Sequence, residues 1–264
     1  MIDRKSNIRT QARFAAAIAA GVAALCSMAQ EALAQGVDEF GAYGQAAEPV
    51  ESDQDVALEF RFGPYLPNVD DEFPAGVEPF GMLFGDSNRY MIGIEADWQL
   101  LKIPHFGTLG PGFGLGYTTM SGKTVLQDGS LSDNQETSLS ILPMYAVAVL
   151  RVDVLARETP VPLVPYGKFG LGAAMWWTSD GINTSRVGGT VGRDTSYGYQ
   201  YALGAMLLLD VFDDESALEL DSTLGVNSSY LFFELYGSDL DGFNSGDQMQ
   251  MGTHSWFTGL AFEI

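Results

Sequence analysis

The chain has 264 residues, a net charge of −21 and 46% hydrophobic residues. This acidity excludes nucleic acid and anionic membrane surfaces as electrostatic partners, because both repel a strongly negative protein. The one cysteine, Cys26, lies in a segment that we expect to be removed, so disulfides and cysteine-based metal or redox sites are excluded from the mature chain.

Residues 1–34 have the layout of a secretory signal peptide. Four basic residues precede an apolar run from Phe14 to Leu25, and Ala32-Leu-Ala34 provides a small-residue cleavage site. Cleavage after Ala34 leaves 9 basic and 32 acidic residues, a net charge of −23. No later run approaches the roughly 18 apolar residues of a transmembrane helix. The sequence therefore predicts an exported protein that is either a periplasmic globular domain or a β-barrel.

Residues 35–55 contain six acidic residues, no basic residue and several small residues. A segment of this composition buries too little apolar surface to fold, so we expect an acidic disordered linker. Residues 56–264 form the predicted folded domain.

From Val56 onward the hydrophobic pattern has a period of two, which is typical of β-strands. Eight such segments occur, of roughly 10–15 residues each, against about 5–6 in ordinary soluble sheets. They begin at residues 56, 90, 109, 137, 163, 196, 226 and 251. The apolar set of the fourth segment is Leu139, Ile141, Tyr145, Val147 and Val149.

The two faces of these segments differ in chemistry. One is continuously apolar and aromatic, whereas the other mixes glycine, small polar residues and charges. A soluble barrel that binds lipids has an apolar lumen and a wet exterior, but a transmembrane barrel has the reverse arrangement. We therefore expect an all-β, up-and-down, antiparallel transmembrane barrel of eight strands, with the apolar sets facing lipid and glycines relieving crowding inside.

The connections alternate in length. Residues 67–88, 121–135, 179–195 and 237–250 are expected to form long outward loops, and residues 103–108 and 156–162 short periplasmic links. The third link, from Phe212 to about Gly225, is longer than this rule predicts and includes a candidate short helix.

The final segment supports the same fold. Trp256, Thr258, Leu260, Phe262 and Ile264 share one face, and the smaller residues between them share the other. Such an amphipathic ending is typical of outer-membrane barrels, whose last strand closes the barrel and is read by the assembly machinery. We expect it to pair with residues 56–65.

Several motifs, taken in order, resemble those of a myxobacterial-type family of outer-membrane β-barrel proteins of unassigned function. The matching segments are Phe62-Gly-Pro-Tyr-Leu-Pro-Asn68, Pro143, Pro162-Leu-Val-Pro-Tyr-Gly-Lys-Phe-Gly-Leu171, Trp176-Trp177, Gly225-Val-Asn-Ser-Ser-Tyr-Leu-Phe-Phe-Glu234 and Gly259-Leu-Ala-Phe-Glu-Ile264. Ile264 stands where a final aromatic residue is usual. The resemblance covers residues 56–264 and implies a location and a fold, but no activity.

Six charged residues are expected to point into the barrel: Glu59, Arg61, Glu95, Asp97, Lys168 and Glu234. Eight strands enclose a lumen that side chains roughly fill, where an unpaired ion is costly. The favoured interpretation is a structural network of ion pairs. The alternative is a narrow, gated ion path.

Five aromatic residues are predicted to lie at the membrane interfaces: Trp98, Trp177, Tyr197, Tyr199 and Trp256. The two histidines offer little catalytic chemistry. His105 falls in a short periplasmic link, and His254 and Ser255 point to opposite faces. A lipid-modifying enzyme would need a different serine near His254, so we predict no catalytic residue, no cofactor and no bound metal in the barrel.

Acidic residues gather in the first and fourth outward loops, at positions 70, 71, 72, 78 and 86 and at 239, 241 and 247. They are interpreted as solvated loops, with divalent cations as an alternative partner. The sequence thus predicts an outer-membrane barrel with a structural, adhesive or surface-interaction role. The expected partners are membrane lipid, lipopolysaccharide and the assembly machinery; a pore and a lipid-modifying enzyme are the alternatives.

Overall fold

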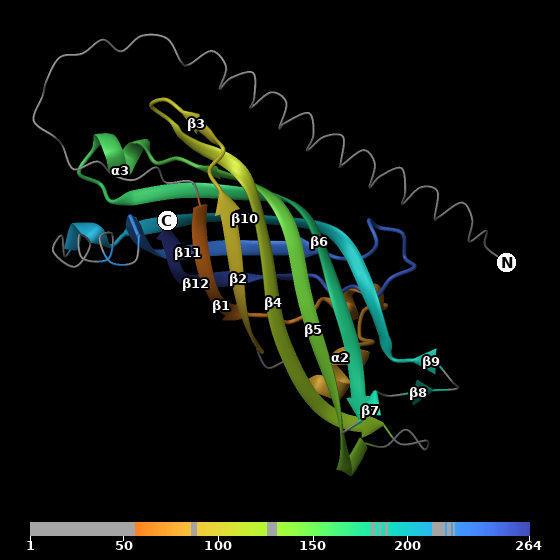
Figure 1. Cartoon of the computed structure of the whole chain (residues 1–264). Coiled ribbons are helices and arrows are strands. Elements are labelled where there is room, and N and C mark those ends of the chain that lie inside the picture. The colour runs from red at the N-terminus through yellow and green to blue at the C-terminus, as the bar shows by residue number, and fades with distance from the viewer. Residues whose placement is uncertain are drawn as a thin grey trace, which may run out of the picture. The chain divides into compact units, whose positions relative to one another are not determined.

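The computed structural model describes residues 56–85, 89–125, 131–180, 183–184, 186–187, 190–212, 220, 223 and 225–264 (Figure 1). The expected signal peptide and linker, residues 1–55, lie outside the described residues, as does most of the third link. Among the described residues, no helix is both long and apolar enough to span a membrane.

Eight antiparallel strands form a closed barrel. They are β1 (Val56–Pro64), β2 (Tyr90–Trp98), β4 (Gly107–Val125), β5 (Leu131–Arg151), β6 (Leu163–Asp180), β10 (Arg193–Leu208), β11 (Ser228–Asp239) and β12 (Thr253–Glu263). Each pairs with the next along the chain, and β12 closes on β1 with Phe60 opposite Leu260. The predicted barrel and its closing seam are confirmed.

Short helices and strands lie at the two ends of the barrel (Figure 1). We call the end where β1 begins and β12 ends the base; it carries β3 (Leu101–Ile103), α3 (Val154–Glu158) and η2 (Asp210–Phe212). The opposite end, the cap end, carries η1 (Val69–Glu72), α2 (Pro79–Phe84), β7 (Asn183–Thr184), β8 (Arg186–Val187) and β9 (Thr190–Val191).

Side chains alternate between lumen and exterior as a period of two requires. In β1, Ala57, Glu59 and Arg61 are buried inside, while Phe60 and Phe62 are exposed outside. Large buried side chains such as Tyr166, Phe232 and Phe257 fill the lumen.

The prediction that the apolar set of the fourth strand faces lipid is wrong. Leu139, Ile141, Tyr145, Val147 and Val149 of β5 are buried in the lumen and do not face outward. The neighbouring strand β4 explains this orientation, because its inner row has glycine at positions 110, 112, 114 and 116. A Cβ added at Gly114 would lie 2.0 Å from the Tyr145 ring, and one at Gly112 would lie 2.9 Å from Val149. Bulky side chains of β5 therefore occupy the space that the glycines leave free.

The predicted loop boundaries also need correction. The expected loop 121–135 is mostly strand, since β4 continues to Val125 and β5 starts at Leu131. Much of the expected loop 179–195 is likewise paired, through β7, β8, β9 and the start of β10. The sequence of these extensions is rich in polar residues and lacks apolar alternation, so the alternation rule does not detect them. The link 156–162 contains the end of the short helix α3.

Candidate functional site

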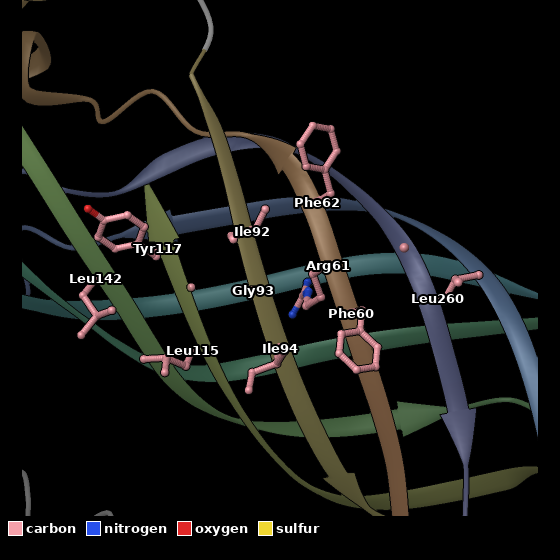
Figure 2. Close-up of a pocket in the computed structure, with 12 residues that line it drawn as sticks. Phe60, Arg61, Phe62, Ile92, Gly93, Ile94, Leu115, Tyr117, Leu142 and Leu260 are labelled. Atoms are coloured by element: carbon pink, nitrogen blue, oxygen red, sulfur yellow. The ribbon is translucent and has the colours of Figure 1, made fainter. Parts of the chain in front are cut away.

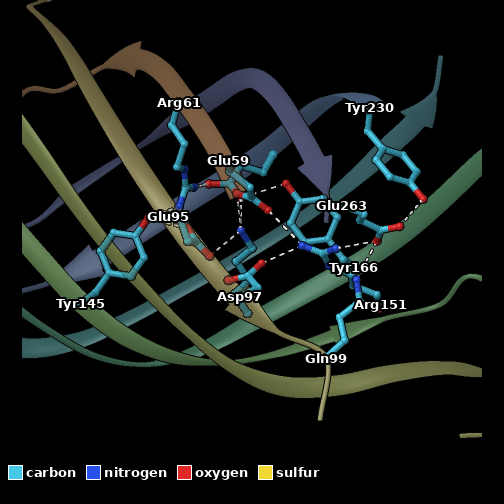
Figure 3. Close-up of polar contacts among 12 residues, drawn as sticks. Glu59, Arg61, Glu95, Asp97, Gln99, Tyr145, Arg151, Tyr166, Tyr230 and Glu263 are labelled. Carbon is cyan, nitrogen blue, oxygen red and sulfur yellow. Dashed lines mark hydrogen bonds and ion pairs between the residues drawn. The ribbon is translucent and has the colours of Figure 1, made fainter. Parts of the chain in front are cut away.

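The most concentrated chemistry in the barrel is a network of charged side chains inside the lumen (Figure 3). Lys168 of β6 lies at its centre. The ammonium Nζ is 2.8 Å from Glu59 Oε2, 2.7 Å from Glu95 Oε1 and 3.8 Å from Glu234 Oε2. All four side chains are fully buried. One cation therefore joins carboxylates from β1, β2 and β11 to β6.

Arg61 is the second cation of this network. It forms ion pairs with Glu95 and Glu234 and donates a hydrogen bond to the Tyr145 hydroxyl, which in turn donates to Glu95 at 2.5 Å. The guanidinium carbon also lies 5.6 Å from the centre of the Phe257 ring. Aromatic faces of this kind stabilise a guanidinium that has lost its water.

Arg151 is the third cation and lies nearer the base. It donates to Asp97 at 2.7 Å and to Glu263 at 3.0 Å, and approaches Glu59 at 3.5 Å. Glu263 also accepts hydrogen bonds from Gln99 and Tyr230, at 2.7 and 2.9 Å. The last strand is thereby tied to the lumen network.

The charges of the network pair with one another, while Arg61 Nε, Asp97 Oδ1 and Arg151 Nε have no hydrogen-bond partner among the described residues. Each of the five buried carboxylates contacts at least one of the three cations, which offsets the large cost of removing these ions from water. Oxygens of Glu59, Glu95 and Asp97 lie within 4.8 Å of one another, a spacing that a metal ion would accept. The Lys168 ammonium lies between Glu59 and Glu95, so the protein supplies positive charge there from its own side chain.

The structure brings together all six charged residues that the sequence singled out: Glu59, Arg61, Glu95, Asp97, Lys168 and Glu234. Sequence reasoning missed Arg151 and Glu263. Arg151 continues the inner row of β5, which the apolar pattern alone places on the lipid face. Glu263 lay on the correct face but stood alone at the end of the chain.

Towards the cap end the buried residues of the lumen are uncharged, and many of them are apolar. Met91, Met120, Leu139 and Ile141 are buried there, in one cluster with side chains from the loops above. Those loop side chains are Val69, Phe80, Leu240 and Met251, all buried. The two segments 65–85 and 240–252 therefore close this end of the lumen with an apolar plug.

Hydrogen bonds hold these two segments together. The Tyr65 hydroxyl donates to the Met251 carbonyl at 2.5 Å, and the backbone N–H of Asn68 donates to the Gly252 carbonyl at 2.8 Å. The Asp70 carboxylate accepts from the backbone amides of Phe80 and Gly81, both at 2.8 Å, and so satisfies free donors at the start of α2. We call segments 65–85 and 240–252 together the cap.

The outer surface of the cap is acidic and partly apolar. Asp71, Glu72 and Glu78 are exposed, and so are the apolar side chains of Phe73, Val77 and Met82. These carboxylates come from the first predicted acidic loop. Segment 65–85 thus combines exposed negative charge with exposed apolar side chains.

His254 lies on the exterior near the cap end. Its Nδ1 is 3.1 Å from Asn68 Nδ2, its Nε2 is 2.8 Å from the Tyr201 hydroxyl, and Asp239 lies 3.6 Å away. An amide nitrogen and a phenol occupy the positions that a serine nucleophile would need. The Ser–His pairing required by the hydrolase alternative is therefore not formed among the described residues. His105 pairs instead with exposed Glu158 at the base.

The five predicted interface aromatics all belong to the outer face of the barrel. Trp98 lies at the base end of β2, in edge contact with Phe113. Tyr197, Tyr199, Trp177 and Trp256 lie toward the cap end of their strands. Aromatic side chains thus occur near both ends of an apolar exterior.

The exterior also contains a groove of about 580 Å³ over β12, β1, β2, β4 and β5 (Figure 2). Its walls are apolar side chains, among them Phe60, Phe62, Ile92, Ile94 and Leu115. Among the described residues that line it, Arg61 alone is charged, and it directs its guanidinium into the lumen and not into the groove.

Comparisons with known proteins identify no family. No family model matches the chain, and no curated protein matches it. Solved structures with a similar arrangement include Ail, the attachment invasion locus protein of Yersinia pestis, with 10% identity, 80% of this chain and 97% of that chain covered, and a TM-score of 0.42. The outer membrane protein OprG of Pseudomonas aeruginosa has 9% identity, 80% and 96% coverage, and a TM-score of 0.47. The N-terminal barrel of OprF from Pseudomonas aeruginosa has 13% identity, 80% and 98% coverage, and a TM-score of 0.34. The barrel assignment itself follows from the strand pairings.

Proposed function

We propose that this protein is an outer-membrane β-barrel that anchors an ordered, acidic surface at the cell exterior. The observation that carries the proposal is the inverted polarity of the closed barrel. Large apolar side chains such as Ile92, Phe169 and Leu203 are more than half exposed, whereas Glu59, Glu95 and Lys168 are buried inside. Hydrocarbon solvates the first group and excludes the second, and a closed barrel leaves no strand edge unpaired in lipid.

In this proposal the base faces the periplasm and the cap faces outward. The apolar belt contacts membrane lipid, and the last strand is read by the assembly machinery. Lipopolysaccharide surrounds the cap end, where divalent cations are candidate partners of the acidic groups. The resemblance to the myxobacterial-type family is compatible with this location and adds no activity.

The role that fits best is structural or adhesive. The ion-pair network and the apolar plug fill the lumen with side chains, which favours a structural or adhesive protein over a pore. The cap presents Phe73, Val77 and Met82 among carboxylates, an arrangement suited to contact with another surface. A pore would require both the ion-pair network and the apolar plug to rearrange. Among the described residues no serine pairs with His254, as a hydrolase would need, so both alternatives rank behind.

The membrane assignment is tested by fractionation and by gel migration. We expect the expressed protein in the outer-membrane fraction and faster migration of the unheated sample, since a folded barrel resists the detergent until boiled. Recovery in the soluble fraction, with migration unaffected by boiling, would overturn the proposal.

The role is tested in cells that lack the protein. Loss of resistance to detergent and chelator would indicate a structural role, whereas loss of attachment with an intact envelope would indicate an adhesive one. Complementation with a chain in which Phe73, Val77 and Met82 are replaced by serine separates the two. It should restore envelope resistance but not attachment.

A further inference from the structure

The exterior groove has a regular construction (Figure 2). Phe62, Ile92 and Tyr117 are register partners across β1, β2 and β4, and form one wall. Phe60, Ile94 and Leu115 are also register partners and form the other wall. The groove thus runs across the strands between two parallel rows of apolar side chains.

The floor of the groove is formed by the row of residues that lies between these two walls. Arg61 pairs with Gly259 on one side and Gly93 on the other, and Gly93 pairs with Gly116. Because side chains of this row point inward, only backbone faces the groove. Leu260 and Leu142 lie at its two ends. Near Leu142 the β4–β5 ladder has no pair between Leu115–Met144 and Thr118–Ile141, where Pro143 has no N–H to donate.

We propose that this groove binds one acyl chain of a lipid in the outer leaflet. The inference rests on the proposed membrane insertion and adds to it a preferred lipid position. The groove crosses the five strands β12, β1, β2, β4 and β5, which span about 19 Å at the usual spacing. With strands tilted about 40° from the barrel axis, a chain in this groove covers about 12 Å of depth, which fits within one leaflet of about 15 Å.

The shape and chemistry of the groove favour an unbranched hydrocarbon chain. Its volume of about 580 Å³ falls within the range of ordinary small-ligand sites, roughly 300–1,000 Å³. The walls lie two residues apart along each strand, about 7 Å, which leaves room for a single file of methylene groups. In a bilayer such a recess has to be filled, because a void forfeits dispersion contacts.

A second copy of this chain fits less well. The groove lies directly below the loop between β1 and β2, which bears the exposed acids Asp71, Glu72 and Glu78. Two copies joined through the groove would bring these carboxylates together. A neutral chain entering from the bilayer meets no such repulsion.

The experiment uses the folded full barrel in phosphatidylcholine vesicles that contain a little phosphatidylcholine with a photoreactive diazirine midway along one acyl chain. After irradiation, digestion and mass spectrometry locate the attached lipid. We expect labelling of Ile92 and Leu115 to exceed that of Leu203 and Leu235 several-fold. Ile92, Leu203 and Leu235 are similarly exposed, at 63%, 68% and 61%, so exposure alone predicts equal labelling.

Two matched variants sharpen the test. Ile92→Trp fills the groove and should reduce labelling of Leu115 to the level of Leu235. Leu203→Trp makes a similar change on β10, on the far side of the barrel, and should leave the labelling of Leu115 unchanged. Uniform labelling around the belt would overturn the groove while leaving insertion intact. Copy-to-copy cross-links through the groove would also overturn it. Absence of labelling anywhere on the exterior of the barrel would overturn the membrane assignment itself.

Discussion

The lumen from the middle of the barrel to the base and the lumen near the cap end are filled in different ways. In the first, Arg61, Arg151 and Lys168 pair with carboxylates from several strands. In the second, Met91, Met120 and Ile141 pack against Phe80 and other side chains of the cap. Ion pairs fix partners and register, because each needs a specific neighbour, whereas apolar packing tolerates substitution but depends on volume. The difference predicts that mutations in the two regions fail in different ways.

The largest effect is expected for Arg151→Met. The change leaves Asp97 and Glu263 without their cation in a buried site, which typically costs about 3–5 kcal/mol. Urea unfolding of the barrel in lipid vesicles, followed by tryptophan fluorescence, measures the loss in the free energy of unfolding.

The matched control for this variant is Arg157→Met. Arg157 is exposed and pairs at 2.8 Å with Asp153, the partly buried residue before α3, and pairs near the surface contribute less than about 1 kcal/mol. Equal effects of the two variants would show that the lumen network does not stabilise the barrel.

The next effect is expected for Phe80→Ala in the apolar plug. Truncating a buried phenylalanine typically costs about 3–5 kcal/mol, but here the loss should appear as local opening of the cap. Hydrogen exchange should accelerate in residues 65–84, while the barrel still migrates as a folded species before boiling.

Met82→Ala is the control on the same helix. Met82 is 74% exposed, whereas Phe80 is 7% exposed, so the truncation should leave exchange in the cap unchanged. If Phe80→Ala instead unfolded the whole barrel, the cap and the barrel would form one cooperative unit.

A smaller effect is expected where the glycines of β4 meet the side chains of β5. Gly114→Ala places a methyl group against the Tyr145 ring, and such overpacking typically costs about 1–3 kcal/mol. Gly167→Ala should cost much less, because its nearest neighbours would lie 3.9 Å away. In a Tyr145→Ala background the cost of Gly114→Ala should vanish. A cost that persists there would contradict the proposed fit.

The smallest effect is expected for Asp70→Ala at the start of α2. Loss of a carboxylate that accepts two backbone amides typically costs about 1 kcal/mol. Limited proteolysis should then cut the cap faster. Asp71→Ala, an exposed neighbour, should not change the cutting rate, and equal acceleration by both variants would rule out the capping role of Asp70.

Much of the barrel could be predicted from the sequence, because period-two alternation requires no knowledge of distant residues. Strands such as β1 and β12, their pairing and the six charged residues of the lumen were all accessible in this way. The facing of β5 was not, because both of its rows are apolar and only the glycines of the neighbouring strand decide which row points inward.

The cap could not be predicted for a related reason. Val69, Phe80 and Leu240 lie in segments without periodicity, and their burial depends on two loops far apart in sequence that meet above the lumen. The ends of β4 and β5 likewise could not be predicted, because their polar sequences lack the apolar alternation that marks the rest of the barrel. Local patterns therefore identified the wall of the barrel, and long-range packing determined what closes it.

Side chains fill the lumen, by ion pairs from the middle of the barrel to the base and by apolar packing near the cap. Electrical recording of the purified, folded protein in planar bilayers tests this most directly. We predict no conductance steps over a wide voltage range. Stable, reproducible steps from the wild-type protein would contradict the filled lumen and would favour a pore.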